Sequence, residues 1–140
     1  MNILVTGARG FIGKNLLETL HNIRDGKERS YGIDSDITVF EYDIDTDPAL
    51  LELYCKNADF VFNLAGINRP KDPEEFMKGN FGFATKLFEM LKKYENKCPV
   101  MISSSVQFGD NSSIWYAQSG FVCFVNIAEM DVKSTSLIRM

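Results

Sequence analysis

The sequence has few of the residues that metal sites and disulfide frameworks need. It contains one histidine, and its three cysteines, Cys55, Cys98 and Cys123, are an odd number at wide spacings. Such spacing fits neither a zinc site nor paired disulfides, so we expect reduced thiols. The longest late apolar run, residues 121–125, is far too short to cross a bilayer. The N-terminus has no charged leader before an apolar stretch. These absences predict a cytoplasmic protein with no membrane partner.

The sequence also lacks an excess of positive charge. It has 15 lysines and arginines against 19 aspartates and glutamates, a formal net charge of -4. The longest basic cluster, Lys92 and Lys93, ends an amphipathic segment, where cations interact favourably with the helix dipole. We therefore expect no nucleic-acid partner. With 45% hydrophobic residues, the chain is rich enough in apolar side chains for one core.

A glycine-spaced turn follows the first apolar segment of the chain. Residues 2–6 predict a buried parallel strand, and residues 14–20 predict an amphipathic helix. Between them, Gly7 permits a tight turn, Gly10 lets backbone N–H groups approach a pyrophosphate, and Gly13 lets the helix pack closely on the strand. The phosphates would lie at the helix N-terminus. This pattern predicts a dinucleotide site. In the alternative, the glycines serve only the turn.

Further strands and helices alternate along the chain. The expected strands are residues 37–42, 59–66 with its exit, and 99–105, and the expected helices are residues 48–56 and 73–94. Thr46 is the expected cap of the first of these helices. Strand and helix alternation predicts an α/β fold, a doubly wound parallel sheet of the Rossmann type, with ligands at the carboxyl ends of the strands. The pattern stops near residue 107. We therefore expect an incomplete sheet in a domain at residues 1–107 and an irregular tail at residues 108–140.

Four segments together resemble one family. Residues 6–13 have the sequence TGARGFIG, residues 63–66 have NLAG, Asn80 lies between Gly79 and Phe81, and residues 103–109 have SSSVQFG. These segments resemble the extended short-chain dehydrogenase/reductase family, which comprises epimerases, dehydratases and reductases of nucleotide sugars. The family's corresponding motifs are TGxxGFIG, HxA followed by Ala or Gly, a helical Asn before a small residue, and SSxxVYG. The resemblance covers about residues 1–107.

Within this family, residues 64–70 and 103–107 are most similar to bacterial capsular-polysaccharide reductases, which reduce a UDP-linked 4-keto-6-deoxy-amino sugar with NADPH. The resemblance implies NADP or NAD as the cofactor and a UDP-linked nucleotide sugar as the substrate. It is also compatible with a homo-oligomer. The cofactor-binding residues that we expect are Gly7, Arg9, Gly10, Phe11, Ile12, Gly13, Asp43, Leu64, Ala65, Gly66 and Asn80.

Two of these residues favour different coenzymes. Asp43, at the end of the second strand, could accept hydrogen bonds from the adenosine ribose and would repel a 2′-phosphate, which favours NAD. Arg9, inside the glycine turn, could instead pair with the 2′-phosphate of NADP, or it could be a solvated cation. The sequence therefore leaves the choice between NAD and NADP open.

The catalytic residues match the family only in part. Ser104 lies five residues before Gly109, the spacing of the family's catalytic hydroxyl, so we expect it to donate to the substrate oxygen. The alternative is a serine at a strand end that bonds to local backbone. The family's acid/base pair is Tyr-x-x-x-Lys. Here the late tyrosine is Tyr116, but Gly120 stands at the lysine position, and we expect no counterpart of the family's substrate-binding lobe in these residues.

These features support three hypotheses. The first is the NAD(P)-binding domain of a nucleotide-sugar reductase, epimerase or dehydratase in capsular polysaccharide precursor synthesis. The second is a non-catalytic NAD(P)-binding module, and the third is an inactive truncated fragment. Whether the chain is itself an enzyme stays open, because Gly120 replaces the lysine.

Overall fold

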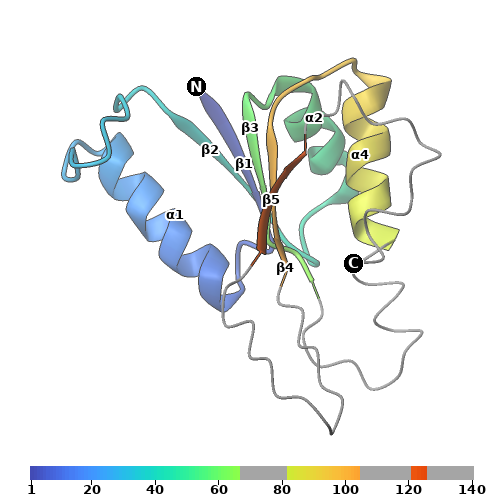
Figure 1. Cartoon of the computed structure of the whole chain (residues 1–140), viewed down its shortest axis with the longest axis horizontal. Coiled ribbons are helices and arrows are strands. Elements are labelled where there is room, and N and C mark those ends of the chain that lie inside the picture. The colour runs from blue at the N-terminus through green and yellow to red at the C-terminus, as the bar shows by residue number, and fades with distance from the viewer. Residues whose placement is uncertain (67–81, 105–120, 126–140) are drawn as a thin grey trace, which may run out of the picture.

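The computed structural model describes residues 1–66, 82–104 and 121–125, which form a five-stranded sheet with helices on both faces (Figure 1). The elements are β1 (Asn2–Thr6), α1 (Phe11–Arg24), β2 (Thr38–Tyr42), α2 (Pro48–Asn57), β3 (Phe60–Asn63), α4 (Phe83–Lys93), β4 (Val100–Ser104) and β5 (Phe121–Val125). Within the described ranges, no helix is long and apolar enough to span a membrane.

The strand order is β2-β1-β3-β4-β5. β1 pairs in parallel with β2 and β3, and β3 pairs in parallel with β4. This arrangement confirms the predicted α/β fold of the Rossmann type with a doubly wound parallel sheet. It also brings the carboxyl ends of β1, β2 and β3 to one edge of the sheet, where such folds bind their ligands.

β5 is the element that the sequence did not predict. It pairs antiparallel with β4, with Val100 opposite Val125 and Ser104 opposite Phe121. A five-residue apolar run has too little periodicity to be assigned as a strand from sequence alone. Residues 121–125 of the expected tail therefore belong to the sheet. The domain boundary expected near residue 107 lies outside the described residues and stays a prediction.

Each face of the sheet has its own core, because successive residues of a strand point to opposite faces. Leu4, Val61 and Val100 pack with side chains of α2 and α4. Ile3 and Val5 pack with α1 on the other face. Figure 1 shows α1 on one side of the sheet and α2 and α4 on the other. Burial on both faces explains why β1 is a continuous apolar run rather than an alternating one.

α1 extends beyond the expected residues 14–20 at both ends. Gly13 lies inside the helix, and Ile23 is buried in its last turn, so the apolar face continues past Leu20. His21 and Arg24 also lie in the last turn, where positive charge interacts favourably with the helix dipole. Because the residues around Ile23 are polar, the sequence pattern does not show where this helix ends.

The expected Thr46 cap of α2 is wrong. Asp47 caps this helix: its carboxylate accepts a hydrogen bond from the Ala49 N–H at 2.9 Å, and Pro48 is the first helical residue. The Thr46 hydroxyl instead accepts from the Asp43 N–H at 2.9 Å. Both residue types are good caps, and proline at the first helical position selects the residue directly before it. Thr46 therefore closes a turn at the end of β2.

Only part of the expected helix at residues 73–94 can be compared with the structure. α4 covers Phe83–Lys93, with Ala84, Leu87 and Leu91 buried on one face. The first turns of the predicted helix lie outside the described residues.

Candidate functional site

Two glycines of the turn between β1 and α1 have no room for a side chain. Gly7 has a φ of +69°, and a Cβ there would lie 2.7 Å from the backbone nitrogen of Ala65. A Cβ on Gly13 would lie 2.2 Å from the carbonyl oxygen of Gly7. Both distances are far shorter than van der Waals contact. Gly7 and Gly13 are therefore required by the close packing of the turn against β3 and α1.

Gly10 is constrained differently. Among the described residues, a Cβ on Gly10 would approach only the Gly7 carbonyl oxygen, at 3.2 Å. Its φ of −66° and ψ of 168° are open to any residue. The Gly10 N–H donates to the same Gly7 oxygen at 3.0 Å, which closes the turn. A Cβ at Gly10 is therefore in tight contact with one oxygen, but it is far less obstructed than a Cβ at Gly7 or Gly13. The absence of a side chain there leaves the approach to the α1 N-terminus clear.

The N-terminus of α1 is suited to an anion. Its N-cap is Gly10, which supplies no side-chain cap, and its first turn contains no acidic residue. The first N–H groups of a helix lack partners within the helix, and together with the dipole they attract negative charge. The side chains of Phe11 and Ile12 are 86% and 55% exposed. The backbone N–H groups of these two residues lie in the first turn of α1, where N–H groups lack partners within the helix.

A buried hydrogen bond holds β3 against the turn. The Thr6 hydroxyl donates to the Asn63 side-chain oxygen at 2.7 Å, and the two residues are 0% and 4% exposed. The Ala65 N–H donates to the Thr6 hydroxyl at 3.4 Å, and the Leu64 N–H donates to the Thr6 carbonyl at 3.2 Å. These bonds place Leu64 and Ala65 directly beside Gly7. Sequence reasoning missed this pair, although both residues end neighbouring strands.

The carboxylate of Asp43 holds the other side of the turn. One oxygen accepts from the Arg9 N–H at 2.7 Å, and the other accepts from the Ile44 N–H at 2.7 Å. The Arg9 guanidinium forms an ion pair with Asp45. The two residues expected to favour different coenzymes are thus bonded to each other. Asp45 was also missed in the sequence, because nothing in its spacing shows that it contacts Arg9.

The structure brings most of the expected cofactor residues to one edge of the sheet. Those that lie there are Gly7, Arg9, Gly10, Phe11, Ile12, Gly13, Asp43, Leu64, Ala65 and Gly66. Ser104 ends β4, the strand next to β3. Asn80 and Tyr116 lie outside the described residues. Their roles, like those of the other expected site residues, stay predictions.

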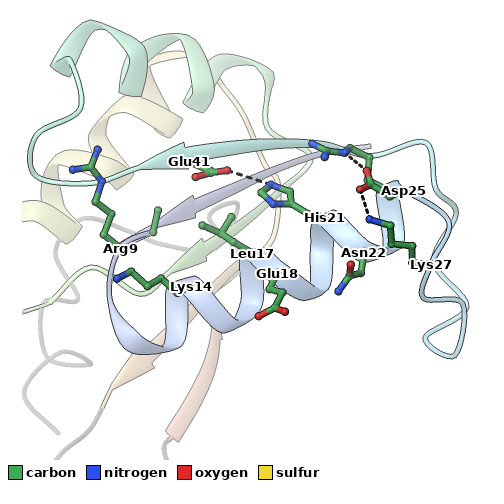
Figure 2. Close-up of a pocket in the computed structure, with 11 residues that line it drawn as sticks. Arg9, Lys14, Leu17, Glu18, His21, Asn22, Asp25, Lys27 and Glu41 are labelled. Atoms are coloured by element: carbon green, nitrogen blue, oxygen red, sulfur yellow. Dashed lines mark hydrogen bonds and ion pairs between the residues drawn. The ribbon is translucent and has the colours of Figure 1, made fainter.

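An open groove of about 570 Å³ runs along α1 beside β2 (Figure 2). His21 Nε2 lies 3.2 Å from a Glu41 carboxylate oxygen across it. At the far end, hydrogen bonds from Arg24 and Lys27 hold the pKa of the Asp25 carboxyl below its usual value. Asp25 is thus paired with two cations of the groove, Arg24 and Lys27. The groove reaches the glycine turn at Ala8 and Arg9, and Figure 2 shows Arg9 and Lys14 at that end of it. In the part of the chain that the structure describes, no group of side chains could hold a metal ion.

The parallel sheet and its glycine turn define a Rossmann-type α/β domain. The chain belongs to the NAD dependent epimerase/dehydratase family, whose sequence model matches residues 3–120.

The chain is similar to larger proteins. It is 37% identical over 107 residues to a UDP-2-acetamido-2,6-beta-L-arabino-hexul-4-ose reductase of Pseudomonas aeruginosa, covering 76% of this chain and 26% of that protein. The crystal structure of the capsular polysaccharide assembling protein CapF from Staphylococcus aureus has 35% sequence identity and a TM-score of 0.56, covering 75% of this chain and 26% of that one. The chain therefore spans about a quarter of the length of these relatives.

A further solved structure contains two ligands. MoeE5 in complex with UDP-glucose and NAD is 25% identical with a TM-score of 0.55, covering 79% of this chain and 39% of that one.

Proposed function

We propose that residues 1–107 form the NAD(P)-binding domain of a nucleotide-sugar reductase, epimerase or dehydratase. The observation that carries this proposal is the contrast among the three glycines. Packing excludes a Cβ at Gly7 and Gly13, whereas among the described residues a Cβ at Gly10 would meet the Gly7 carbonyl oxygen alone, which would need to shift by a few tenths of an ångström. Gly10 lies at an uncapped helix N-terminus, where a bound pyrophosphate would need the space.

The residues at this edge fit a dinucleotide. In the proposed arrangement, the N–H groups that begin α1 bind the pyrophosphate, and Asp43 faces the adenosine ribose at the end of β2. Leu64, Ala65 and Gly66, which follow β3, line the path toward the reactive ring, and Asn80 is a further proposed cofactor contact. A bound coenzyme of this kind supplies or accepts a hydride.

The substrate is proposed from the relatives. The Pseudomonas protein is a UDP-sugar reductase, and MoeE5 was solved with UDP-glucose. We infer a UDP-linked sugar as the substrate and a place in capsular or other surface polysaccharide synthesis. Ser104, at the end of β4, and Tyr116 are the proposed groups that contact the substrate oxygen.

A second candidate function is a coenzyme-binding module without turnover. The observation that favours it is Gly120, which stands four residues after Tyr116 where the family has lysine. Binding experiments test what the two candidates share, and turnover experiments separate them.

The first experiment is titration calorimetry of the purified chain with NADH and with NADPH. We expect binding of at least one coenzyme, and loss of binding in Gly10→Val because a branched side chain would enter the pyrophosphate space. Circular dichroism should show that Gly10→Val stays folded. Gly82→Ala is the control, because Gly82 has an ordinary φ of −62° and a Cβ there meets nothing within 4 Å among the described residues. Equal affinities of the wild type and Gly10→Val would refute the site.

A further inference from the structure

We propose that Asp45 is a specificity-determining residue, which favours NAD(H) over NADP(H) by pairing with Arg9. This inference rests on the proposed coenzyme site, and it names the residue that decides between the two coenzymes. Asp45 would act through the position of the Arg9 guanidinium and through its own charge.

The first step is the position of Arg9. Its backbone N–H donates to Asp43 at 2.7 Å, and its guanidinium pairs with Asp45. One arginine therefore lies between two carboxylates at the carboxyl end of β2. The Arg9 and Asp45 side chains are 67% and 49% exposed, so a ligand can reach both. In this arrangement the guanidinium is engaged by a protein carboxylate rather than free for a ligand phosphate.

The second step is the charge at this end of β2. Asp43, Asp45 and Asp47 lie within five residues, and Asp47 caps α2 through the Ala49 N–H. Among the described ion pairs, Arg9 is the cation that pairs with Asp45. NADP(H) differs from NAD(H) by a 2′-phosphate on the adenosine ribose. Three carboxylates and one guanidinium leave an excess of negative charge at this end of β2. This charge repels the 2′-phosphate, whereas it does not repel the neutral 2′-hydroxyl of NAD(H).

The third step is the size of the effect. An exposed ion pair is weak, and competition from Asp45 for Arg9 is worth up to about a fivefold change in affinity. Removing the Asp45 carboxylate also removes its repulsion of the phosphate. Both contributions act on NADPH and leave NADH nearly unchanged, so the ratio of the two affinities is the informative quantity.

The test is a double-mutant cycle measured by titration calorimetry with NADH and NADPH. The proteins are the wild type, Asp45→Asn, Arg9→Ala and the double variant. We expect Asp45→Asn to raise the affinity for NADPH relative to NADH by up to about fivefold through release of the guanidinium, with a further rise from the lost repulsion. In the Arg9→Ala background the same substitution should raise the ratio less, because no guanidinium is released.

Asp34→Asn is the matched control. It removes the same charge from an exposed residue that precedes β2, at the opposite end of the strand from Asp45. A similar rise of the NADPH affinity relative to the NADH affinity in Asp34→Asn would show that the effect comes from net charge alone. That result would overturn the inference.

The outcomes separate the inference from the proposed function. If the wild type binds neither coenzyme, the proposed function fails. If it binds a coenzyme and Asp45→Asn leaves the ratio unchanged, the inference fails while the proposed function stands. An equal rise with and without Arg9 would overturn the role of the Arg9 pair.

Discussion

The three glycines of the turn show how one residue type meets different demands within seven positions. At Gly7 and Gly13 a side chain would meet backbone atoms, which cannot move without displacing β3 or α1. At Gly10 it would meet one carbonyl oxygen at a distance that a small shift relieves. Substitution should therefore affect stability at the first two positions and ligand binding at the third.

Alanine at Gly13 should destabilise the fold, whereas alanine at Gly10 should not. The Gly13 Cβ would overlap the Gly7 carbonyl oxygen, and overpacking of this kind costs about 1–3 kcal/mol or more. Urea denaturation followed by circular dichroism measures the difference. Equal midpoints for Gly13→Ala and Gly10→Ala would contradict the packing argument.

Asp43 and Arg9 should shift the coenzyme preference in opposite directions. Asp43→Ala removes a negative charge near the ribose and should improve NADP(H) relative to NAD(H), while Arg9→Ala should do the reverse. Because the Asp43 carboxylate also accepts the Arg9 N–H, Asp43→Ala should weaken both coenzymes as the turn loosens. Dissociation constants for all four coenzyme forms provide the measurement. Unchanged ratios in both variants would show that neither side chain reaches the ribose.

The buried thiols should be unreactive in the folded protein. Burial is the main cause that raises the pKa of Cys55 to about 12 and that of Cys98 to about 11. At pH 8 both groups therefore stay protonated, and the thiolate is the species that iodoacetamide attacks. Peptide mapping by mass spectrometry should find neither residue alkylated in buffer and both alkylated in urea. Rapid labelling of Cys55 under native conditions would show that the core around it opens.

At the scale of helices and strands, α4 illustrates what periodicity predicts well. Its buried residues Ala84, Leu87 and Leu91 recur at helical spacing, and Leu87 and Leu91 are 0% exposed. They pack on the same core as Leu4 and Val61 of the central strands. The helix is therefore fixed by its apolar face.

Truncation of that face should be costly. Leu87→Ala should lower the free energy of unfolding by about 2–5 kcal/mol, because it removes a fully buried side chain and leaves a cavity. Lys86→Ala, at an exposed position of the same helix, should change it by less than about 0.5 kcal/mol. Urea denaturation of the three proteins tests the contrast. Similar losses of unfolding free energy in both variants would show that the buried face of α4 is not what stabilises the helix.

The elements that sequence reasoning placed wrongly or missed share a physical cause. Thr46 and Asp47 are both competent caps, and only the observed hydrogen bonds show which one begins α2. β5 is a short apolar run whose strand character comes from pairing with β4, a contact across the sheet. A local sequence pattern shows which secondary structure a segment favours, but it does not show which residues far along the chain the segment contacts. The Thr6–Asn63 and Arg9–Asp45 contacts were not predicted for the same reason, because each joins residues that are far apart in the sequence.

At the scale of the whole chain, the class of fold followed directly from the sequence. The glycine turn and the alternation of strands and helices are local signals, and they were sufficient to place the candidate site at the carboxyl edge. These local signals do not determine the coenzyme preference, because the preference depends on how Arg9, Asp43 and Asp45 contact one another in the folded protein.

The 140-residue chain should bind coenzyme but show little turnover. Protonation of the oxyanion left by hydride transfer needs a well-tuned acid, a contribution typically worth about 10² to 10⁴-fold. Gly120 replaces the lysine that assists the tyrosine in the family. We therefore expect no steady oxidation of NADPH with a UDP-4-keto-6-deoxy-amino sugar, measured at 340 nm. Steady oxidation that is abolished by Ser104→Ala would instead establish an active enzyme.

The central position of β1 has a consequence for how the protein is made. β1 leaves the ribosome before β2 and β3, yet it lies between them, and its Thr6 hydroxyl bonds to a residue 57 positions later. At ordinary translation rates, roughly 3 to 11 seconds separate the synthesis of these two residues. During that interval Ile3, Leu4 and Val5 have no sheet partner on the β3 side. The nascent chain thus presents an unsatisfied apolar strand, a form that chaperones bind, until β3 has emerged.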